Sequence, residues 1–249
     1  MDTDPVREYG GALAAVTVTR RGRPCVDGLR ATLPAGTRLV VADTASSARD
    51  VDVVRLVEDV GWAAAVNRAV AGLAPDVGWV VLACPAARWR PGAIDLLLAA
   101  AARHRGPVAG AVTARRPRAG GWAAPGPARR GPRPDPGRHR RRPTGWLSTA
   151  AALVRRSAWD SVDGFDSRYL GGPGGIGDVD LGDRLGRAGW LVVSVTGAAA
   201  DVEPGDTNVE GHGILEPHAA GLHRYVRDRA RGPARALAAL ARRTPDPHT

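Results

Sequence analysis

Short apolar runs alternate with segments of helical spacing through the first half of the 249-residue chain. Three runs are rich in small and β-branched residues and are predicted to be buried strands: ALAAVTVT (12–19), TRLVVAD (37–43) and GWVVLAC (78–84). Two segments have the apolar spacing of helices: WAAAVNRAVAGL (62–73) and PGAIDLLLAAAARH (91–104). This alternation predicts an α/β fold with a mostly parallel central sheet flanked by helices.

The second half of the chain contains two basic segments. Residues 114–143 are rich in arginine and proline and are predicted to form a flexible, low-complexity loop. Residues 218–249 include an amphipathic helical pattern, interrupted at Gly232. The other predicted elements are a strand, an apolar run with a short helix and turn, and a second strand, at 106–113, 144–170 and 190–196. We therefore expect a single domain over 1–217 and a basic helical tail over 218–249.

The basic charge of the chain comes entirely from arginine, with 35 arginines, no lysine and a formal net charge of +10. Such a charge favours acidic partners, and it supports a nucleic-acid-binding or scaffolding protein as an alternative function. A GC-rich genome produces the same composition without selection for binding. Because aromatic residues are not interleaved with the arginines of 114–143, we expect no specific nucleic-acid partner.

Cysteine usage and hydropathy indicate the compartment. Cys25 and Cys84 are too few and too far apart for a disulfide framework or a zinc site, which favours a reducing environment. The first residues are polar and acidic, unlike a secretory signal, and no 18 apolar residues run uninterrupted. We expect a cytoplasmic protein, either soluble or peripheral at the inner face of the membrane through its arginine-rich tail.

Four short segments, in order along the chain, carry a family resemblance. They are LVVADTASS (39–47), GWAAAVNRAV (61–70), WLSTAAALVRRSAWDSVDGFDSRYL (146–170) and GDVDLGDRLGRAGW (177–190). Together they resemble the family 2 inverting glycosyltransferases of the GT-A fold, especially the rhamnosyltransferase-like branch, over roughly residues 12 to 230. The resemblance implies a GT-A-like fold with a Rossmann-like nucleotide-binding half. It also implies transfer of a sugar, with inversion, from a nucleotide-diphosphate donor to the hydroxyl of a glycan, lipid-linked or small-molecule acceptor.

The donor side of the implied site lies at a strand end. Ligands of open α/β sheets bind beyond the carboxyl ends of the strands, where Asp43 is expected. By resemblance, Asp43 accepts a hydrogen bond from the nucleotide base, with Ser46 and Asn67 helping to form the pocket. An Asp at a strand end also favours an Asx-turn, so this alternative stays open.

The acceptor side of the implied site lies at a late helix. Asp178 matches the general base that removes the proton of the acceptor hydroxyl, Asp180 and Arg184 would support that helix and the acceptor loop, and Trp146 would line the acceptor cleft. A base on a helix is well preorganised. Two alternatives stay open: Asp178 as a helix N-cap, and the segment 178–180 as a metal motif.

The chain departs from the family pattern at functional positions. A divalent cation, Mg²⁺ or Mn²⁺, is usual for the family, but Cys84 and Ala86 stand where its acidic pair is expected. The Glu expected before the base is Gly177, and the Gly expected after WLS is Thr149. Such losses are also expected of a catalytically inactive, glycosyltransferase-like pseudoenzyme.

Two substitutes for the missing metal motif are available in the sequence. A carboxylate from Glu203 or Asp201 could bind a metal, or Arg88 and Arg90 could neutralise the donor diphosphate directly, which makes the transfer metal-independent. Cys84 itself is expected to be a small buried residue rather than a nucleophile.

Overall fold

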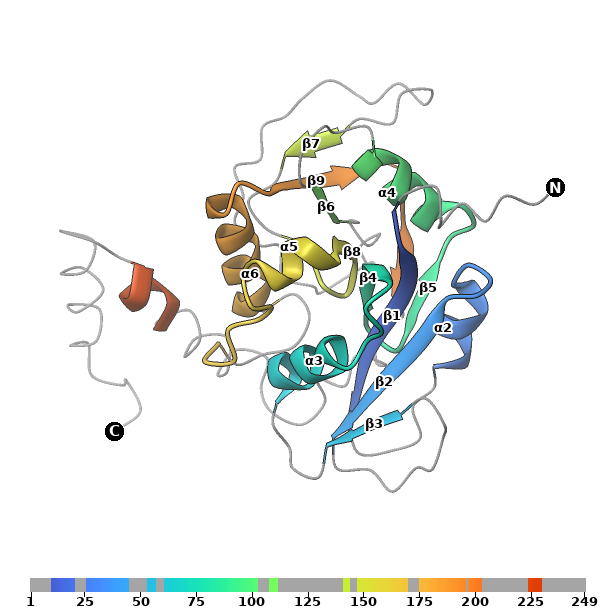
Figure 1. Ribbon diagram of the computed structural model, residues 1–249, viewed down its shortest axis with the longest axis horizontal. Coiled ribbons are helices and arrows are strands. Elements are labelled where there is room, and N and C mark those ends of the chain that lie inside the picture. Colours follow the sequence, from blue (N-terminus) through green and yellow to red (C-terminus); the bar gives the residue numbers. More distant parts are fainter. Residues whose placement is uncertain are drawn as a thin grey trace, which may run out of the picture.

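The computed structural model describes residues 10–20, 26–44, 53–56, 61–102, 108–111, 141–143, 147–169, 175–195, 197–202 and 224–229. Within these ranges, the centre of the molecule is an eight-stranded sheet in the order β3-β2-β1-β4-β8-β6-β9-β7 (Figure 1). The strands are β1 (Ala12–Arg20), β2 (Arg38–Thr44), β3 (Val53–Leu56), β4 (Val77–Ala83), β6 (Val108–Ala111), β7 (Arg141–Pro143), β8 (Ala151–Arg155) and β9 (Leu191–Val195).

Strand direction determines which residues meet at the edge of the sheet. The pairs β1–β2, β1–β4, β2–β3 and β6–β9 are parallel, whereas β8 is antiparallel to β4 and β6, and β7 is antiparallel to β9. The prediction of a mostly parallel sheet is therefore confirmed. Because β8 runs against its neighbours, its first residues lie beside the carboxyl end of β4, where the Cys84 N–H donates to the Ala150 carbonyl at 2.9 Å.

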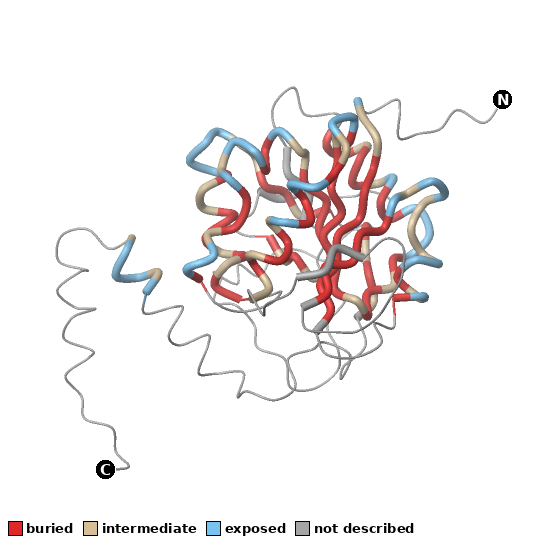
Figure 2. The backbone as a smooth tube through the Cα atoms, turned by 60° about the horizontal axis from the view of Figure 1, so that its bottom comes forward, coloured by how far each residue is buried: buried red, intermediate tan, exposed pale blue. Residues whose placement is uncertain are grey.

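Helices cover both faces of the sheet. The helices α2 (Asp27–Thr32) and α4 (Ala93–Ala102) pack on one face together with a two-stranded sheet of β5 (Ala87–Trp89) and β10 (Ala200–Val202). The other face is covered by α3 (Trp62–Ala71), α5 (Arg156–Asp160) and α6 (Ile176–Arg187). Figure 2 shows a buried interior, to which β1, β2, β4 and β8 contribute most of their residues.

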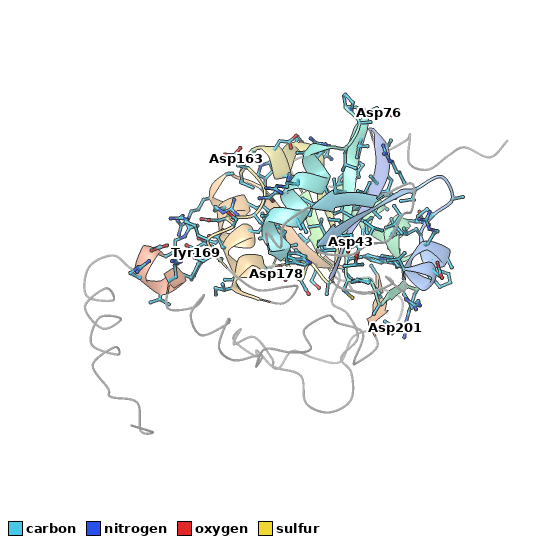
Figure 3. The ribbon with its side chains drawn as sticks, turned by 90° about the horizontal axis from the view of Figure 1, so that it is seen from below. Asp43, Asp76, Asp163, Tyr169, Asp178 and Asp201 are labelled. Atoms are coloured by element: carbon cyan, nitrogen blue, oxygen red, sulfur yellow. The ribbon has the colours of Figure 1, made fainter. Side chains whose placement is uncertain are left out.

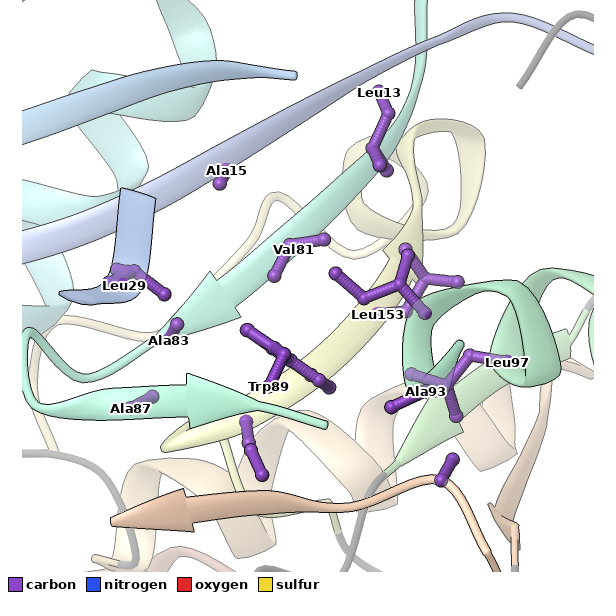
Figure 4. Packing of buried hydrophobic residues seen from close by; sticks show 14 of the residues in the cluster. Leu13, Ala15, Leu29, Val81, Ala83, Ala87, Trp89, Ala93, Leu97 and Leu153 are labelled. Atoms are coloured by element: carbon purple, nitrogen blue, oxygen red, sulfur yellow. The ribbon is translucent and has the colours of Figure 1, made fainter. Parts of the chain in front are cut away.

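Alternation along the strands divides the core into two layers. In β1, Leu13 and Ala15 belong to the layer under α2 and α4, while Ala14 and Val16 belong to the layer under α3 and α6. Trp89, 3% exposed, projects into the first layer from β5 (Figure 4). Successive strand side chains point to opposite faces, so a strand buried on both faces has a continuous apolar sequence.

The predicted elements are found with shifts of a few residues at their ends. The three expected strands correspond to β1, β2 and β4, the two expected helices to α3 and α4, and the later strands to β6 and β9. The elements α2, β3 and the β5–β10 pair were not predicted, because they are short and have weak periodicity. Of the expected 114–143 loop, only 141–143 lies within the described residues, and it forms β7.

The described part of the expected C-terminal tail is a helix over residues 224–229, beyond α6 in Figure 1. The Arg224 guanidinium donates to the Arg168 carbonyl at 3.2 Å, and the Tyr169 hydroxyl donates to Asp228 at 3.3 Å. Among the described residues, no helix has both the length and the apolar character needed to cross a membrane.

Candidate functional site

Asp43 is the penultimate residue of β2, at the carboxyl edge of the sheet, and is 2% exposed. The Thr19 hydroxyl, across the β1–β2 pair, donates to Asp43 Oδ1 at 3.3 Å. Asp43 Oδ2 and the Thr17 hydroxyl oxygen are buried and have no hydrogen-bond partner among the described residues. Buried polar atoms are costly when unpaired, so these two oxygens suit donor and acceptor groups supplied by a ligand.

Asp178 lies in the first turn of α6, and its side chain is 1% exposed. The helix begins after Gly175, which is the N-cap residue, and no side chain caps the helix. Asp178 is therefore inside the helix and not its N-cap, which removes that alternative. Its carboxylate faces the turn before β8, where the Thr149 N–H donates to Oδ2 at 3.0 Å and the Thr149 hydroxyl donates to Oδ1 at 2.5 Å.

Asp180 points to a different set of partners. It is fully buried, and its Oδ2 accepts a hydrogen bond from Arg184 Nε at 2.6 Å, while its Oδ1 accepts one from Arg229 of the 224–229 helix. Arg184 also donates to the Val162 carbonyl at 2.5 Å, and this contact ties α6 to the turn after α5. Burial lowers the pKa of Arg229, but the hydrogen bond and charge of Asp180 outweigh it and raise the pKa overall.

These partners argue against a metal motif at 178–180. Asp178 is bonded by Thr149, and both oxygens of Asp180 are bonded by arginines. The two carboxylates therefore do not converge on one point. Asp180 and Arg184 tie α6 to the 224–229 helix and to the turn after α5, and their support of the acceptor loop stays a prediction.

The residues in place of the family's acidic pair do not fit a hard cation. Cys84 is 2% exposed, and burial raises the pKa of its thiol to about 11, so the thiol stays protonated at neutral pH. Ala86 offers no ligand atom, and no cluster of three or more histidine, cysteine or acidic side chains occurs in the described part of the chain. Mg²⁺ and Mn²⁺ prefer oxygen ligands, which these positions lack.

Arg88 lies on β5, just past this position, and Arg90 directly follows the strand. Arg90 donates through Nε and Nη2 to the two carboxylate oxygens of Asp201 on β10, both at 3.1 Å, in an ion pair that is about half exposed. The Arg88 guanidinium packs against helix α2, where a Cβ added at Gly28 would lie 1.9 Å from its Cζ. Binding of the donor diphosphate by Arg90 would require exchange of its Asp201 partner, and for both arginines this role stays a prediction.

Asn67 of α3 joins that helix to the Gly-Phe-Asp turn. Its Nδ2 donates to the Phe165 carbonyl at 2.7 Å, and its Oδ1 accepts from the Phe165 N–H at 2.9 Å. Gly164, with φ of +64°, leaves room for this amide, because a Cβ there would lie 2.6 Å from Asn67 Oδ1. Asn67 thus has a structural role in the scaffold, and its contact with a nucleotide stays a prediction.

Three predicted site residues lie outside the described residues: Ser46, Trp146 and Glu203. The sequence analysis identified Thr149 only as a departure from the family pattern and missed Arg229 and Thr17. The signal for Thr149 was a hydroxyl at a position where glycine is expected. The arginines of the tail carry no sequence signal that indicates Asp180 as the partner of Arg229.

The two halves of the site share one edge of the sheet. Figure 3 shows Asp43 and Asp178 toward one end of the domain, and Asp76 and Asp163 toward the other. The turn containing Thr149 precedes β8, which is three strands from β2 in the order β2-β1-β4-β8. At the usual spacing of about 4.8 Å between strands, the ends of β2 and β8 are about 14 Å apart along the edge. A ligand with a base at one end and a reacting carbon at the other can span such a distance.

No family model matches the sequence. The chain is similar to the N-acetylglucosaminyl-diphospho-decaprenol L-rhamnosyltransferase of Mycobacterium tuberculosis, in strains CDC 1551 / Oshkosh and ATCC 25618 / H37Rv. The identity is 42% over 175 residues, which covers 56% of this chain and 54% of the relative. The chain thus spans about half the length of the curated relatives it matches.

Solved glycosyltransferase structures share the fold at low sequence identity. GalNAc-T7 with UDP, GalNAc and Mn²⁺ has a TM-score of 0.64 at 12% identity, with 88% of this chain and 48% of that one covered. The mannosyltransferase PcManGT from Pyrobaculum calidifontis, with GDP-Man and Mn²⁺, has a TM-score of 0.56 at 14% identity, with 96% and 81% covered. The TarS 1–349 structure of S. aureus has a TM-score of 0.55 at 12% identity, with 78% and 61% covered. The chain has the GT-A fold and is related in sequence to rhamnosyltransferases, as the four sequence segments indicate.

Proposed function

We propose that this protein is a glycosyltransferase that moves a sugar from a nucleotide-diphosphate donor to an acceptor hydroxyl with inversion at the anomeric carbon. The observation that carries the proposal is the placement of Asp178: a buried carboxylate on the rigid first turn of α6, at the same sheet edge as Asp43. A preorganised base at one end of a nucleotide-binding edge is what an inverting transfer requires.

The donor binds with its base at Asp43. The unpartnered Oδ2 of this carboxylate accepts a hydrogen bond from an N–H of the base, and the Thr17 hydroxyl offers a second polar contact. An imide N–H flanked by carbonyls, as in uracil or thymine, matches this combination of a carboxylate and a hydroxyl. We therefore propose UDP-linked or dTDP-linked hexoses as donors.

The acceptor hydroxyl approaches Asp178. The carboxylate takes the hydroxyl proton as the oxygen attacks the anomeric carbon from the face opposite the leaving group. The bond from that carbon to the nucleotide diphosphate breaks, and the diphosphate leaves with the bonding electrons. An arginine neutralises the charge of the leaving diphosphate, and Arg88 is the arginine nearest in sequence to Cys84 and Ala86, where the family's acidic pair is expected.

The acceptor class is inferred from the mycobacterial relatives, whose name specifies an N-acetylglucosaminyl-diphospho-decaprenol acceptor. We propose a polyprenyl-diphosphate-linked glycan of the cell envelope as the acceptor. Such an acceptor would bring the cytoplasmic chain to the membrane surface, where the arginines of the 218–249 tail can contact anionic lipid.

Nucleotide titration tests the donor site. Binding of UDP and dTDP by calorimetry, with and without Mn²⁺, is expected to be seen, and Asp43→Asn is expected to weaken it. Binding that needs no Mn²⁺ supports neutralisation by arginine. If neither nucleotide binds under either condition, the donor site is absent and the chain is a pseudoenzyme.

Turnover tests the base. In Asp178→Asn, transfer to a polyprenyl-diphosphate-linked acceptor is expected to fall at least 100-fold, the lower range for loss of general base catalysis. Stability should change by only about 1 to 2 kcal/mol, because the Asn carbonyl keeps the Thr149 N–H bond and its NH₂ can donate to the Thr149 hydroxyl. A fully active variant would exclude Asp178 as the base.

A further inference from the structure

We propose that Thr149 is a positioning residue for Asp178, and that its side-chain hydroxyl fixes this carboxylate in the orientation and ionisation state needed for proton abstraction. The inference rests on the proposed function, because it assigns a role to Asp178 in the transfer. It goes beyond the family resemblance, which predicts a glycine without a side chain at this position.

The contact is a two-pronged clamp from one residue. The Thr149 N–H donates to Oδ2 at 3.0 Å, and the hydroxyl donates to Oδ1 at 2.5 Å. Thr149 is completely buried and Asp178 is 1% exposed, so water competes little for either bond. The hydroxyl distance lies in the range of charge-assisted O–H···O⁻ bonds, which are roughly twice as strong as neutral ones.

The clamp connects two rigid elements of the fold. Thr149 lies in a turn held at both ends: the Ala151 N–H donates to the Ser148 carbonyl at 3.2 Å, and the Ala150 carbonyl accepts from the Cys84 N–H at 2.9 Å. Asp178 lies in the first turn of α6. The two bonds therefore fix the Asp178 carboxylate relative to the carboxyl end of β4.

The two prongs have different chemical requirements. Any residue other than proline can supply the backbone N–H, but the second bond needs a side-chain donor, which the glycine expected at this position lacks. Rotation about χ2 of an aspartate is broad, so each hydrogen bond to a carboxylate oxygen limits how far the carboxylate plane can turn. The hydroxyl of Thr149 adds such a limit at Oδ1, and the stiff χ1 of a β-branched residue keeps the hydroxyl in place.

The second bond also favours the reactive form of the base. Burial disfavours an ionised carboxylate, and hydrogen bonds donated to that carboxylate counteract this effect. Only the ionised form can accept a proton from the acceptor. The hydroxyl of Thr149 thus supports both the geometry and the charge of Asp178.

The test compares Thr149→Val, which keeps the shape and loses the hydroxyl, with Thr149→Ser, which keeps the hydroxyl. In Thr149→Val we expect kcat to fall about 10- to 100-fold, the effect of one lost hydrogen bond to a charged group. The donor KM should stay within about twofold, and the acidic limb of the pH profile of kcat/KM should move to higher pH. Thr149→Ser should keep kcat within about threefold and leave the pH profile in place.

Thr37→Val is the matched control, because the Thr37 hydroxyl is buried without a described partner at the opposite end of β2 from Asp43. It should leave both kcat and the pH profile unchanged. A Thr149→Val enzyme with the kcat and pH profile of the wild type would overturn the inference. So would equal losses in the Val and Ser variants, which would indicate packing rather than the hydroxyl.

A readout that needs no turnover separates this inference from the proposed function. The titration of the Asp178 carboxyl is followed by ¹³C NMR of the full-length protein labelled at aspartate, with the signal assigned by its absence in Asp178→Asn. We expect its midpoint in Thr149→Val to rise by about one pH unit relative to wild type. An unchanged midpoint refutes the inference even if the enzyme transfers sugar. A raised midpoint in a protein that transfers no sugar refutes only the proposed function.

Discussion

The contact between Arg229 and Asp180 predicts that the tail helix stabilises the helix that carries the proposed base. Asp180 is fully buried and is bonded by two arginines, one from its own helix and one from residues 224–229. Arg229→Met removes the second arginine and keeps most of its apolar stem. The change leaves a buried carboxylate oxygen without its charged donor.

The size of the effect follows from burial. Removal of one partner of a fully buried ion pair costs about 3 to 5 kcal/mol. The Arg229 side chain is 23% exposed, and Arg184 remains bonded to Oδ2 of Asp180. We therefore expect about 1 to 3 kcal/mol of lost stability, which corresponds to a fall in Tm of roughly 2 to 12 °C for a chain of this size.

Urea denaturation at neutral pH measures this loss. Arg187→Met is the matched control: the Arg187–Asp183 pair lies on the same helix at 3.1 Å, but Arg187 is 56% exposed. An exposed pair of this kind contributes at most about 1 kcal/mol. If the two variants lose the same free energy of unfolding, the 224–229 helix does not stabilise α6 through Asp180, and the reasoning fails.

Two further substitutions test the scaffold. Gly164→Ala should cost about 2 to 4 kcal/mol of stability, because φ is +64° and the added Cβ would lie 2.6 Å from Asn67 Oδ1 and 2.7 Å from the Trp159 ring. Gly189→Ala is the control: φ is +87° but the added Cβ would meet open space, so the loss in the same denaturation assay should be only about 1 to 2 kcal/mol. Equal losses in the two variants would refute the steric argument. Burial raises the pKa of the Cys84 thiol from 9.0 to about 11, so the folded state holds the thiol proton more tightly than the unfolded state does. The stability that results is fully present below pH 9 and is lost as the pH rises through 11. Wild type should lose about 2 to 3 kcal/mol more than Cys84→Ala between pH 8.5 and 11, and parallel stability curves for the two proteins would contradict the assignment.

The sequence alone determined the class of fold and the positions of the main elements. Continuous apolar runs such as 78–84, alternating with helical segments, are typical of strands covered on both faces by helices, so the sheet and its covered faces follow from local pattern. The Asp near the end of β2 and the helix that begins near Asp178 were also predicted, because strand ends and helix starts have local signals. A resemblance in four ordered segments added the GT-A topology, including the order of the elements.

The tertiary structure decided which partners these side chains have. Nothing local indicated that β8 runs against β4, and this reversal is what brings Thr149 to Asp178, 29 residues away. The pairing of Asp180 with Arg229, 49 residues further along, likewise depends on where the tail helix packs. Local periodicity reflects the burial of each element's own faces, whereas a hydrogen bond between distant residues depends on how separate elements pack. The two carboxylates of α6 could therefore be identified in the sequence. Packing determined that Asp178 is bonded by the Thr149 hydroxyl and Asp180 by two arginines.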